Sequence, residues 1–147
     1  MMIKLNEGLR ERIQKEGEGA YPNECCGFLL GRIEDDGGRI AEAIIPIENA
    51  REEAEQYHRF RIEPEDFMRA EKEARKQHWD VLGFYHSHPD HQAAPSEYDR
   101  EHALPFYSYV IVSITGTGGK TGRAGDMKSW ELSPGRREFF EEEMLCR

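Results

Sequence analysis

Hydrophobic and polar positions follow two spacings along this chain, and the change of spacing divides it into helices and strands. Near the N-terminus Leu5, Leu9 and Ile13 recur every four residues, which is the spacing of the apolar stripe on an amphipathic helix. We therefore predict a helix over residues 3–16. A second helix is expected to begin at Pro64, because the first helical turn needs no N–H group from that residue.

Short apolar runs of strand length make up most of the remaining chain. The first two runs flank Asp35–Gly38, whose sequence DDGG predicts a turn and hence a hairpin. Residues 95–104 suggest a short helix, and the glycine-rich residues 115–126 suggest a hairpin loop. Ser133 and Pro134 suit the N-cap and first turn of a C-terminal helix. The predicted strands cover residues 25–33, 39–49, 57–62, 79–88, 107–114 and 127–132.

This order of elements predicts an α/β protein with a mixed, mostly antiparallel sheet flanked by helices. A chain of 147 residues fits a single domain over residues 1–147. Its net charge of −9 disfavours a nucleic-acid-binding surface, which is normally basic. No run approaches the roughly 18 apolar residues of a membrane span, and the first residues lack the apolar core of a signal peptide.

The cysteines bear on the cellular compartment and on metal binding. The chain has three, an odd number, and Cys25 and Cys26 are adjacent, so a secreted disulfide framework is not expected. We expect a cytoplasmic protein. Alternation along a strand would put one of the two adjacent thiols inside the core and the other outside. A zinc site built from Cys and His has no CxxC motif to support it.

Candidate chemistry is concentrated in FYHSHPDHQAAPSEYD, residues 84–99, where an apolar run ends in metal-binding groups. Because side chains alternate across a strand, His86 and His88 should fall on the same side. Two imidazoles placed in this way are a natural pair of zinc ligands. Asp99 is a candidate third ligand. Three protein ligands with water in the fourth position are typical of a catalytic zinc site.

The same stretch allows other interpretations. The sequence SEYD resembles a helix capping box with aspartate in its last position, so Ser96 and Asp99 could serve helix initiation, alone or together with metal binding. His91 is either a rival metal ligand or a loop residue. Ser87 should face away from both imidazole rings, which argues against a Ser-His-Asp triad.

The joint spacing of His, His, Ser and Asp resembles the signature of the JAMM, or MPN+, zinc metalloprotease family. His86, His88, Ser96 and Asp99 match it residue by residue, with prolines where the family usually has them. The family also uses a glutamate before an apolar, glycine-containing strand, and PNECCGFLLG places Glu24 there. The resemblance covers roughly residues 3–133. The long insertions of some eukaryotic deubiquitinases are missing, so the chain looks like the compact prokaryotic form.

This resemblance implies a fold, a cofactor and a mechanism. The fold would be the cytidine-deaminase-like MPN fold, with Zn²⁺ held by His86, His88 and Asp99. The nucleophile would be a zinc-activated water, because zinc lowers the pKa of bound water from about 15.7 to about 7. Glu24 would be the general base, and Ser96 would donate a hydrogen bond to the developing oxyanion.

The implied substrate is an amide bond after the C-terminal Gly-Gly of a ubiquitin-like or sulfur-carrier protein. Such a tail is extended, and we expect residues 45–60 to line its groove. Two other functions stay open: a protein-binding scaffold without activity, which the complete motif argues against, and a zinc hydrolase of a small amide. The leaving group, whether lysine, cysteine or another amine, also stays open.

Overall fold

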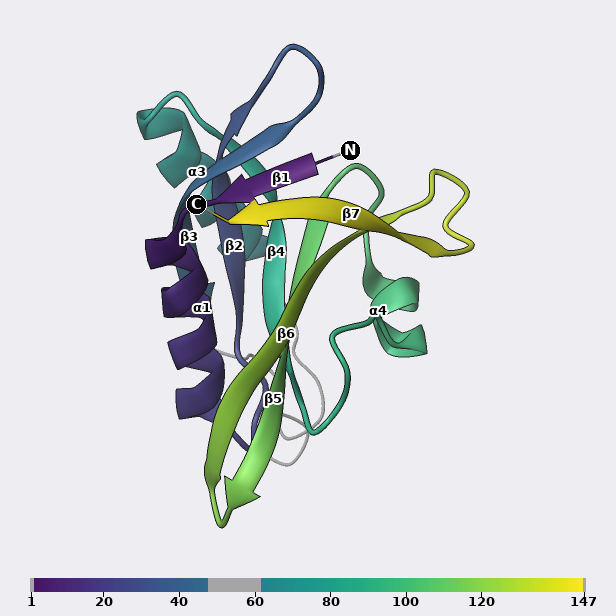
Figure 1. The fold of residues 1–147 in the computed structure, drawn as a ribbon. Helices are drawn as coiled ribbons and strands as arrows, with labels where there is room; N and C mark the ends of the chain where they lie inside the picture. Colours follow the sequence, from purple (N-terminus) through teal and green to yellow (C-terminus); the bar gives the residue numbers. More distant parts are fainter. Residues whose placement is uncertain (1, 48–61, 147) are drawn as a thin grey trace.

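The computed structural model describes residues 2–47 and 62–146, and Figure 1 shows how its elements are arranged. Their order along the chain is β1 (Met2–Leu5), α1 (Glu7–Ala20), β2 (Cys26–Ile33), β3 (Arg39–Ile47), α3 (Pro64–Lys76), β4 (Asp80–Pro89), α4 (Glu97–His102), β5 (Ser108–Gly118), β6 (Thr121–Leu132) and β7 (Phe139–Cys146).

One mixed sheet forms the centre of the fold and closes on itself in the order β1-β3-β2-β4-β5-β6-β7. β1 completes the closure by pairing in parallel with both β3 and β7. β4 and β5 are also parallel, whereas β2 with β3, β2 with β4, β5 with β6 and β6 with β7 are antiparallel. The predicted α/β class with a mixed, mostly antiparallel sheet is therefore confirmed.

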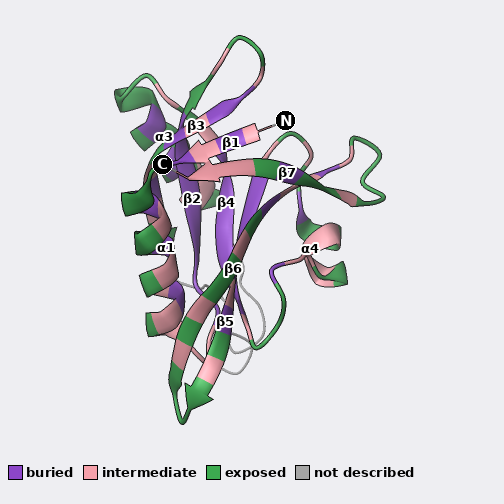
Figure 2. Cartoon of the chain, viewed as in Figure 1, coloured by how far each residue is buried: buried purple, intermediate pink, exposed green. Residues whose placement is uncertain are grey.

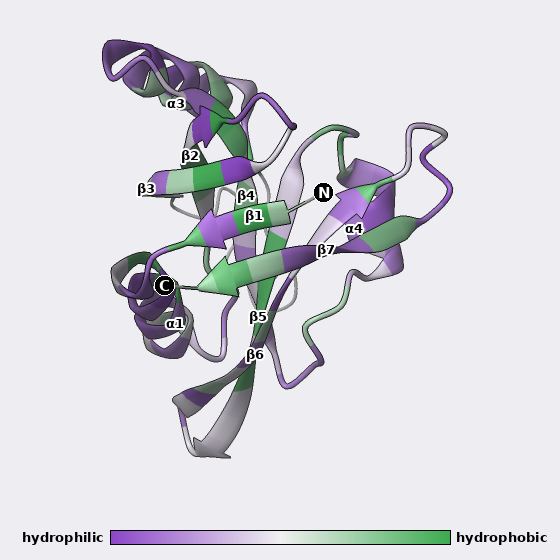
Figure 3. Cartoon of the chain, turned by 45° about the horizontal axis from the view of Figure 1, so that its top comes forward, coloured by the Kyte–Doolittle hydropathy of each residue, from purple (hydrophilic) through white to green (hydrophobic). Residues whose placement is uncertain are grey.

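Two apolar clusters cover the two faces of the central strands. Leu9 and Ile13 of α1 belong to the first cluster, together with core residues of β1 to β5. Ala70 and Ala74 of α3 belong to the second, against the aromatic side chains of β2 and β4. Figure 2 shows that the central strands are buried over most of their length. The strands carry most of the apolar positions, whereas the helices are largely hydrophilic (Figure 3).

The N-terminal segment corrects the predicted helix over residues 3–16. Met2–Leu5 is a strand, and α1 begins after Asn6, whose side chain accepts a hydrogen bond from the Leu9 N–H group at 2.8 Å. Ile3 and Leu5 are both buried, with the spacing of a strand. Leu5 fits both spacings, and its pairing with β7 decides for the strand.

The predicted C-terminal helix is wrong. Ser133 does accept hydrogen bonds through its side chain, from the N–H groups of Arg137 at 3.2 Å and Glu138 at 3.4 Å. These bonds close a turn, in which the Arg136 N–H group also bonds to the Ser133 carbonyl. The chain then continues as strand β7, because β6 and β1 offer it partners on both sides.

The glycine-rich residues 115–126 form the ends of two paired strands, where a loop was expected. β5 runs to Gly118 and β6 starts at Thr121. A Cβ atom on Gly116 would lie 2.2 Å from the Tyr21 hydroxyl oxygen, and one on Gly122 would lie 2.8 Å from Cγ of Tyr21. The glycines therefore allow Tyr21 to pack against these strands.

The remaining predictions divide into two groups. The helix at Pro64, the short helix within residues 95–104 and the hairpin of β2 and β3 are confirmed. The expected strand over 57–62, apart from Ile62, and most of the suspected groove at 45–60 lie outside the described residues. In the described ranges, none of the helices is both long and apolar enough to cross a lipid bilayer.

Candidate metal centre

Strand β4 carries His86 and His88 to the same side of the sheet. The two residues are 1% and 8% exposed, and their Nε2 atoms lie 3.1 Å apart. Nδ1 of His88 lies 3.0 Å from the carbonyl oxygen of Gln92. This carbonyl can only accept, so Nδ1 of His88 carries the proton and its Nε2 atom keeps a lone pair for a metal.

The start of helix α4 brings a carboxylate to these rings. Ser96 is the N-cap: its Oγ atom accepts the Asp99 N–H group at 3.1 Å, and Oδ2 of Asp99 accepts the Ser96 N–H group at 2.9 Å. The same Oδ2 atom lies 3.2 Å from Nε2 of His88 and 3.4 Å from Nε2 of His86. The predicted capping box is confirmed, and one oxygen belongs to both the cap and the cluster.

The size of this cluster fits zinc. The atoms Nε2 of His86, Nε2 of His88 and Oδ2 of Asp99 form a triangle with sides of 3.1, 3.2 and 3.4 Å. Zinc bonds of about 2.0–2.2 Å in tetrahedral directions place neighbouring ligand atoms about 3.3 Å apart. Over residues 2–47 and 62–146, this is the one group of His, Cys, Asp and Glu ligand atoms close enough together to hold a metal ion.

Electrostatics favour the protonation states that bind a metal. Burial lowers the pKa of His86, and the charge of Asp99 only partly opposes this effect. Burial would raise the pKa of Asp99, but the charge that His86 carries when it is protonated, the contacts with both imidazole rings and the hydrogen bond from the Ser96 N–H group hold it well below its usual range. A neutral imidazole and an ionised carboxylate are the forms that coordinate zinc.

Glu24 lies beside the cluster, two residues before strand β2 begins. The antiparallel ladder of β2 and β4 pairs Cys26 with His86, so continuing this register places Glu24 opposite His88 on the same face of the sheet. Glu24 is 8% exposed. It lines a cavity of about 530 Å³ together with His88, Ser96 and Asp99. The structure thus brings every residue of the predicted motif to one site.

The rival residues lie elsewhere. Ser87 is fully buried on the opposite face of β4, where its Oγ atom accepts the Cys25 N–H group at 2.8 Å. His91 is exposed at the rim of the cavity and is not part of the ligand cluster. Cys25 and Cys26 are both buried, so the expectation that one points outward is wrong. Burial raises the pKa of the Cys25 thiol to about 12, which disfavours the thiolate that a nucleophile would need.

Comparison with known proteins identifies the family. Residues 6–133 match the family described as prokaryotic homologs of the JAB domain. The chain belongs to this family. A desampylase from Haloferax volcanii is 36% identical over 99 residues, which cover 67% of this chain and 68% of that protein.

Solved structures share the fold of this JAB-family chain. A protein from Desulfitobacterium hafniense is 31% identical, with a TM-score of 0.80 over 99% of this chain and 93% of that one. A JAB1/MPN domain protein from Archaeoglobus fulgidus has a TM-score of 0.57 over 98% of both chains. Its sequence is 20% identical, so this likeness shows the fold alone. The fold implied by the sequence motif is therefore confirmed.

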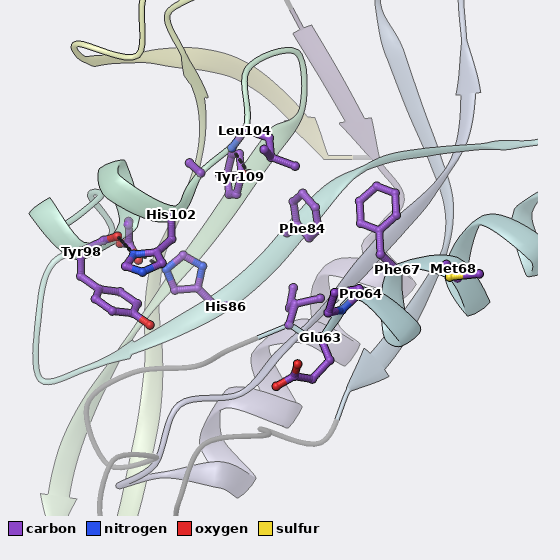
Figure 4. A pocket seen from close by; sticks show the side chains of 13 residues that line it. Glu63, Pro64, Phe67, Met68, Phe84, His86, Tyr98, His102, Leu104 and Tyr109 are labelled. Carbon is purple, nitrogen blue, oxygen red and sulfur yellow. Dashed lines mark hydrogen bonds and ion pairs between the residues drawn. The ribbon is translucent and has the colours of Figure 1, made fainter.

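A second cavity adjoins His86 and Asp99 of this JAB-family domain, and the sequence does not predict it. It has a volume of about 550 Å³ and is lined mainly by apolar side chains. Figure 4 shows His86 and Tyr98 on one side of it and Pro64 and Phe67 of α3 on the other. The signal in the sequence is the Phe67–Met68 pair, the two large apolar side chains of α3. Met68 is 67% exposed. The cluster of candidate metal ligands therefore lies between a polar cavity and an apolar one.

Proposed function

We propose that this JAB-family domain is a zinc-dependent isopeptidase. Its substrate would be a conjugate of a ubiquitin-like or sulfur-carrier protein, hydrolysed at the amide bond after the carrier's C-terminal Gly-Gly. The observation that carries this proposal is the zinc-sized triangle of His86, His88 and Asp99, with Glu24 lining the same cavity. The similarity to a desampylase supports an isopeptidase that acts on a protein modifier.

The proposed hydrolysis gives separate roles to the zinc ligands, to Glu24 and to Ser96. Zinc, held by the triangle, would polarise the scissile carbonyl and make a water acidic enough to react near neutral pH. The Glu24 carboxylate accepts a proton from the attacking water and returns it to the nitrogen of the leaving amine. The Ser96 hydroxyl already accepts the Asp99 N–H group, so its own proton is available for the substrate oxygen.

The test combines metal analysis with cleavage of defined conjugates. Purified protein should contain one zinc per chain. It should cleave a Gly-Gly carrier joined to lysine or to cysteine, lose this activity with a chelator and regain it with added zinc. Protein that binds no stoichiometric zinc at neutral pH would rule out the proposal. Cleavage of small amides but of no carrier conjugate would show a small-molecule hydrolase in its place.

Glu24→Gln separates catalysis from metal binding. It should keep zinc, because Glu24 is not part of the ligand triangle, and lower turnover by roughly 10²- to 10⁴-fold through loss of the proton acceptor. The exposed His78 provides a control, since His78→Ala should change neither property. Turnover that survives in Glu24→Gln would contradict the mechanism while leaving the fold assignment in place.

A further inference from the structure

We propose that Ser87, which stands between the two histidines, is a positioning residue that holds Glu24 opposite His88. The inference rests on the proposed function, because it assigns Ser87 a part in the same reaction. Ser87 does not reach the reacting atoms: its side chain lies on the face of β4 that α1 covers, as its neighbour Gly17 shows. Its effect must therefore pass through the backbone.

The hydrogen bonds between β2 and β4 show how this works. The paired ladder ends at Cys26 and His86. One residue further on, the Ser87 N–H group donates to the Cys25 carbonyl at 3.1 Å. The Cys25 N–H group donates to the Ser87 side chain, Oγ, at 2.8 Å. Beyond the paired ladder, the Ser87 side chain thus adds a second hydrogen bond to the one backbone bond that joins the two segments.

The second of these bonds acts directly on Glu24. The N–H group of Cys25 belongs to the planar peptide unit that begins at the Glu24 carbonyl carbon. Fixing this N–H group fixes the plane of that peptide, and with it the backbone angle ψ of Glu24. Ser87 therefore sets the direction from which the Glu24 side chain leaves the main chain, while its neighbours His86 and His88 point to the other face.

Burial makes this hydrogen bond hard to replace. Ser87 is 0% exposed and Cys25 is 7% exposed. Helix α1 lies directly over them: a Cβ atom on Gly17 would be 3.4 Å from Cβ of Ser87. Without the Ser87 hydroxyl, the Cys25 N–H group would be left in a place that water does not reach, and the peptide would turn to find another acceptor.

The deciding variant is Ser87→Ala, studied in the full zinc-loaded protein. A misplaced catalytic group costs up to roughly 100-fold in rate, so kcat should fall by about 10- to 100-fold. KM and zinc affinity should stay unchanged, because the substrate contacts and the ligand triangle remain. Ser87→Thr keeps the hydroxyl oxygen and should recover most of kcat. Unchanged kcat in Ser87→Ala, or a loss of zinc affinity that matches the loss of kcat, would overturn the proposal.

Ser129→Ala is the matched control. Ser129 is also 0% exposed, and its hydroxyl makes a 2.8 Å hydrogen bond to Glu142, away from the metal centre. Ser129→Ala should lower the free energy of unfolding about as much as Ser87→Ala does, and it should keep the wild-type kcat. A fall in kcat equal to that of Ser87→Ala would show that any buried serine has this effect, and the positioning role would be refuted.

Two further measurements separate this inference from the proposed function. In a Glu24→Gln background, Ser87→Ala should cause no further loss of rate, because the group it positions is already inactive.

Amide hydrogen exchange at Cys25 should accelerate in Ser87→Ala and not in Ser129→Ala. This exchange needs no activity, so it decides on the Ser87–Cys25 bond even if the protein cleaves no conjugate. Unaltered exchange at Cys25 in Ser87→Ala would refute the inference about Ser87 and leave the proposed function untouched.

Discussion

Oδ2 of Asp99 lies 3.4 Å from Nε2 of His86, although the two residues belong to different elements, α4 and β4. The same oxygen accepts the Ser96 N–H group, so the first turn of a short helix sets the position of a predicted metal ligand. Helix initiation and the proposed metal binding therefore share one atom.

Replacing Asp99 should remove the metal. Asp99→Ala deletes one of the three proposed zinc ligands, and zinc affinity should fall by more than roughly 100-fold. Loss of a residue that only hydrogen-bonds to a metal ligand already costs about 10- to 100-fold in metal affinity. Zinc titration with a competing chelator measures this change. Glu101→Ala, at an exposed acid on the same helix, is the control and should keep zinc. Equal affinity in the two variants would show that Asp99 is not a ligand.

Ser96 should have two separable contributions. Ser96→Ala removes the cap and should lower the free energy of unfolding by about 1 kcal/mol. It should also lower kcat by roughly 10²- to 10³-fold through loss of the oxyanion donor. Ser96→Asp restores a cap acceptor but offers no proton, so stability should return while turnover stays low. Thermal melts and conjugate cleavage measure the two effects. Restored turnover in Ser96→Asp would contradict the donor role.

Glu16 should make stability depend on pH. Its Oε1 atom accepts the Tyr85 hydroxyl at 3.0 Å, and burial raises its pKa above the usual 4.5, with hydrogen bonds from Tyr85 and Cys25 opposing. A raised pKa in the folded state gives stabilisation that is present below pH 4.5 and is lost as the pH rises through the folded-state value. Glu16→Gln removes this loss and should be more stable than wild type at neutral pH.

Urea unfolding at several pH values tests this prediction. The advantage of Glu16→Gln should shrink as the pH falls below 4.5, where the wild-type carboxyl is protonated. Glu11→Gln, at an exposed position of the same helix, is the control for removing a negative charge. An advantage that is the same at every pH would contradict the prediction.

Arg39 should stabilise a buried carboxylate. It is 8% exposed and lies 3.0 Å from Glu142, which is 3% exposed. Arg39→Met would leave this charge without its cationic partner and should cost about 3–5 kcal/mol of unfolding free energy. Arg32→Met breaks an exposed pair with Glu42 and should cost no more than about 1 kcal/mol. Similar losses in denaturant unfolding would show that burial does not matter here.

The sequence pattern was enough to predict those features that depend on interactions between residues close together in the chain. Alternation placed His86 and His88 on one face, and the SxxD sequence predicted the cap at Ser96; the structure shows both. Pro64 likewise marked the start of a helix. In each of these cases the controlling contact lies within a few residues of the signal.

The errors arose where distant partners decide the structure. Leu5 fits a helix by its spacing to Leu9, but pairing of β1 with β3 and β7 closes the sheet. Ser133 resembles a helix cap, but partners for β7 on both sides favour a strand. Glu24 was placed at the site through family resemblance, because only the ladder of β2 and β4 brings it to His88. No local spacing records such pairings.

The parallel pairing of β4 with β5 has a consequence for how such a domain can change over time. Parallel neighbours cannot be joined by a tight turn and need a long crossover. Here that crossover is residues 90–107, and it contains Ser96 and Asp99. It cannot be trimmed away without rebuilding the sheet. Related proteins that lose the proposed activity are therefore expected to lose it by substitution of single side chains at the site. Their backbone around the inactive site should stay the same.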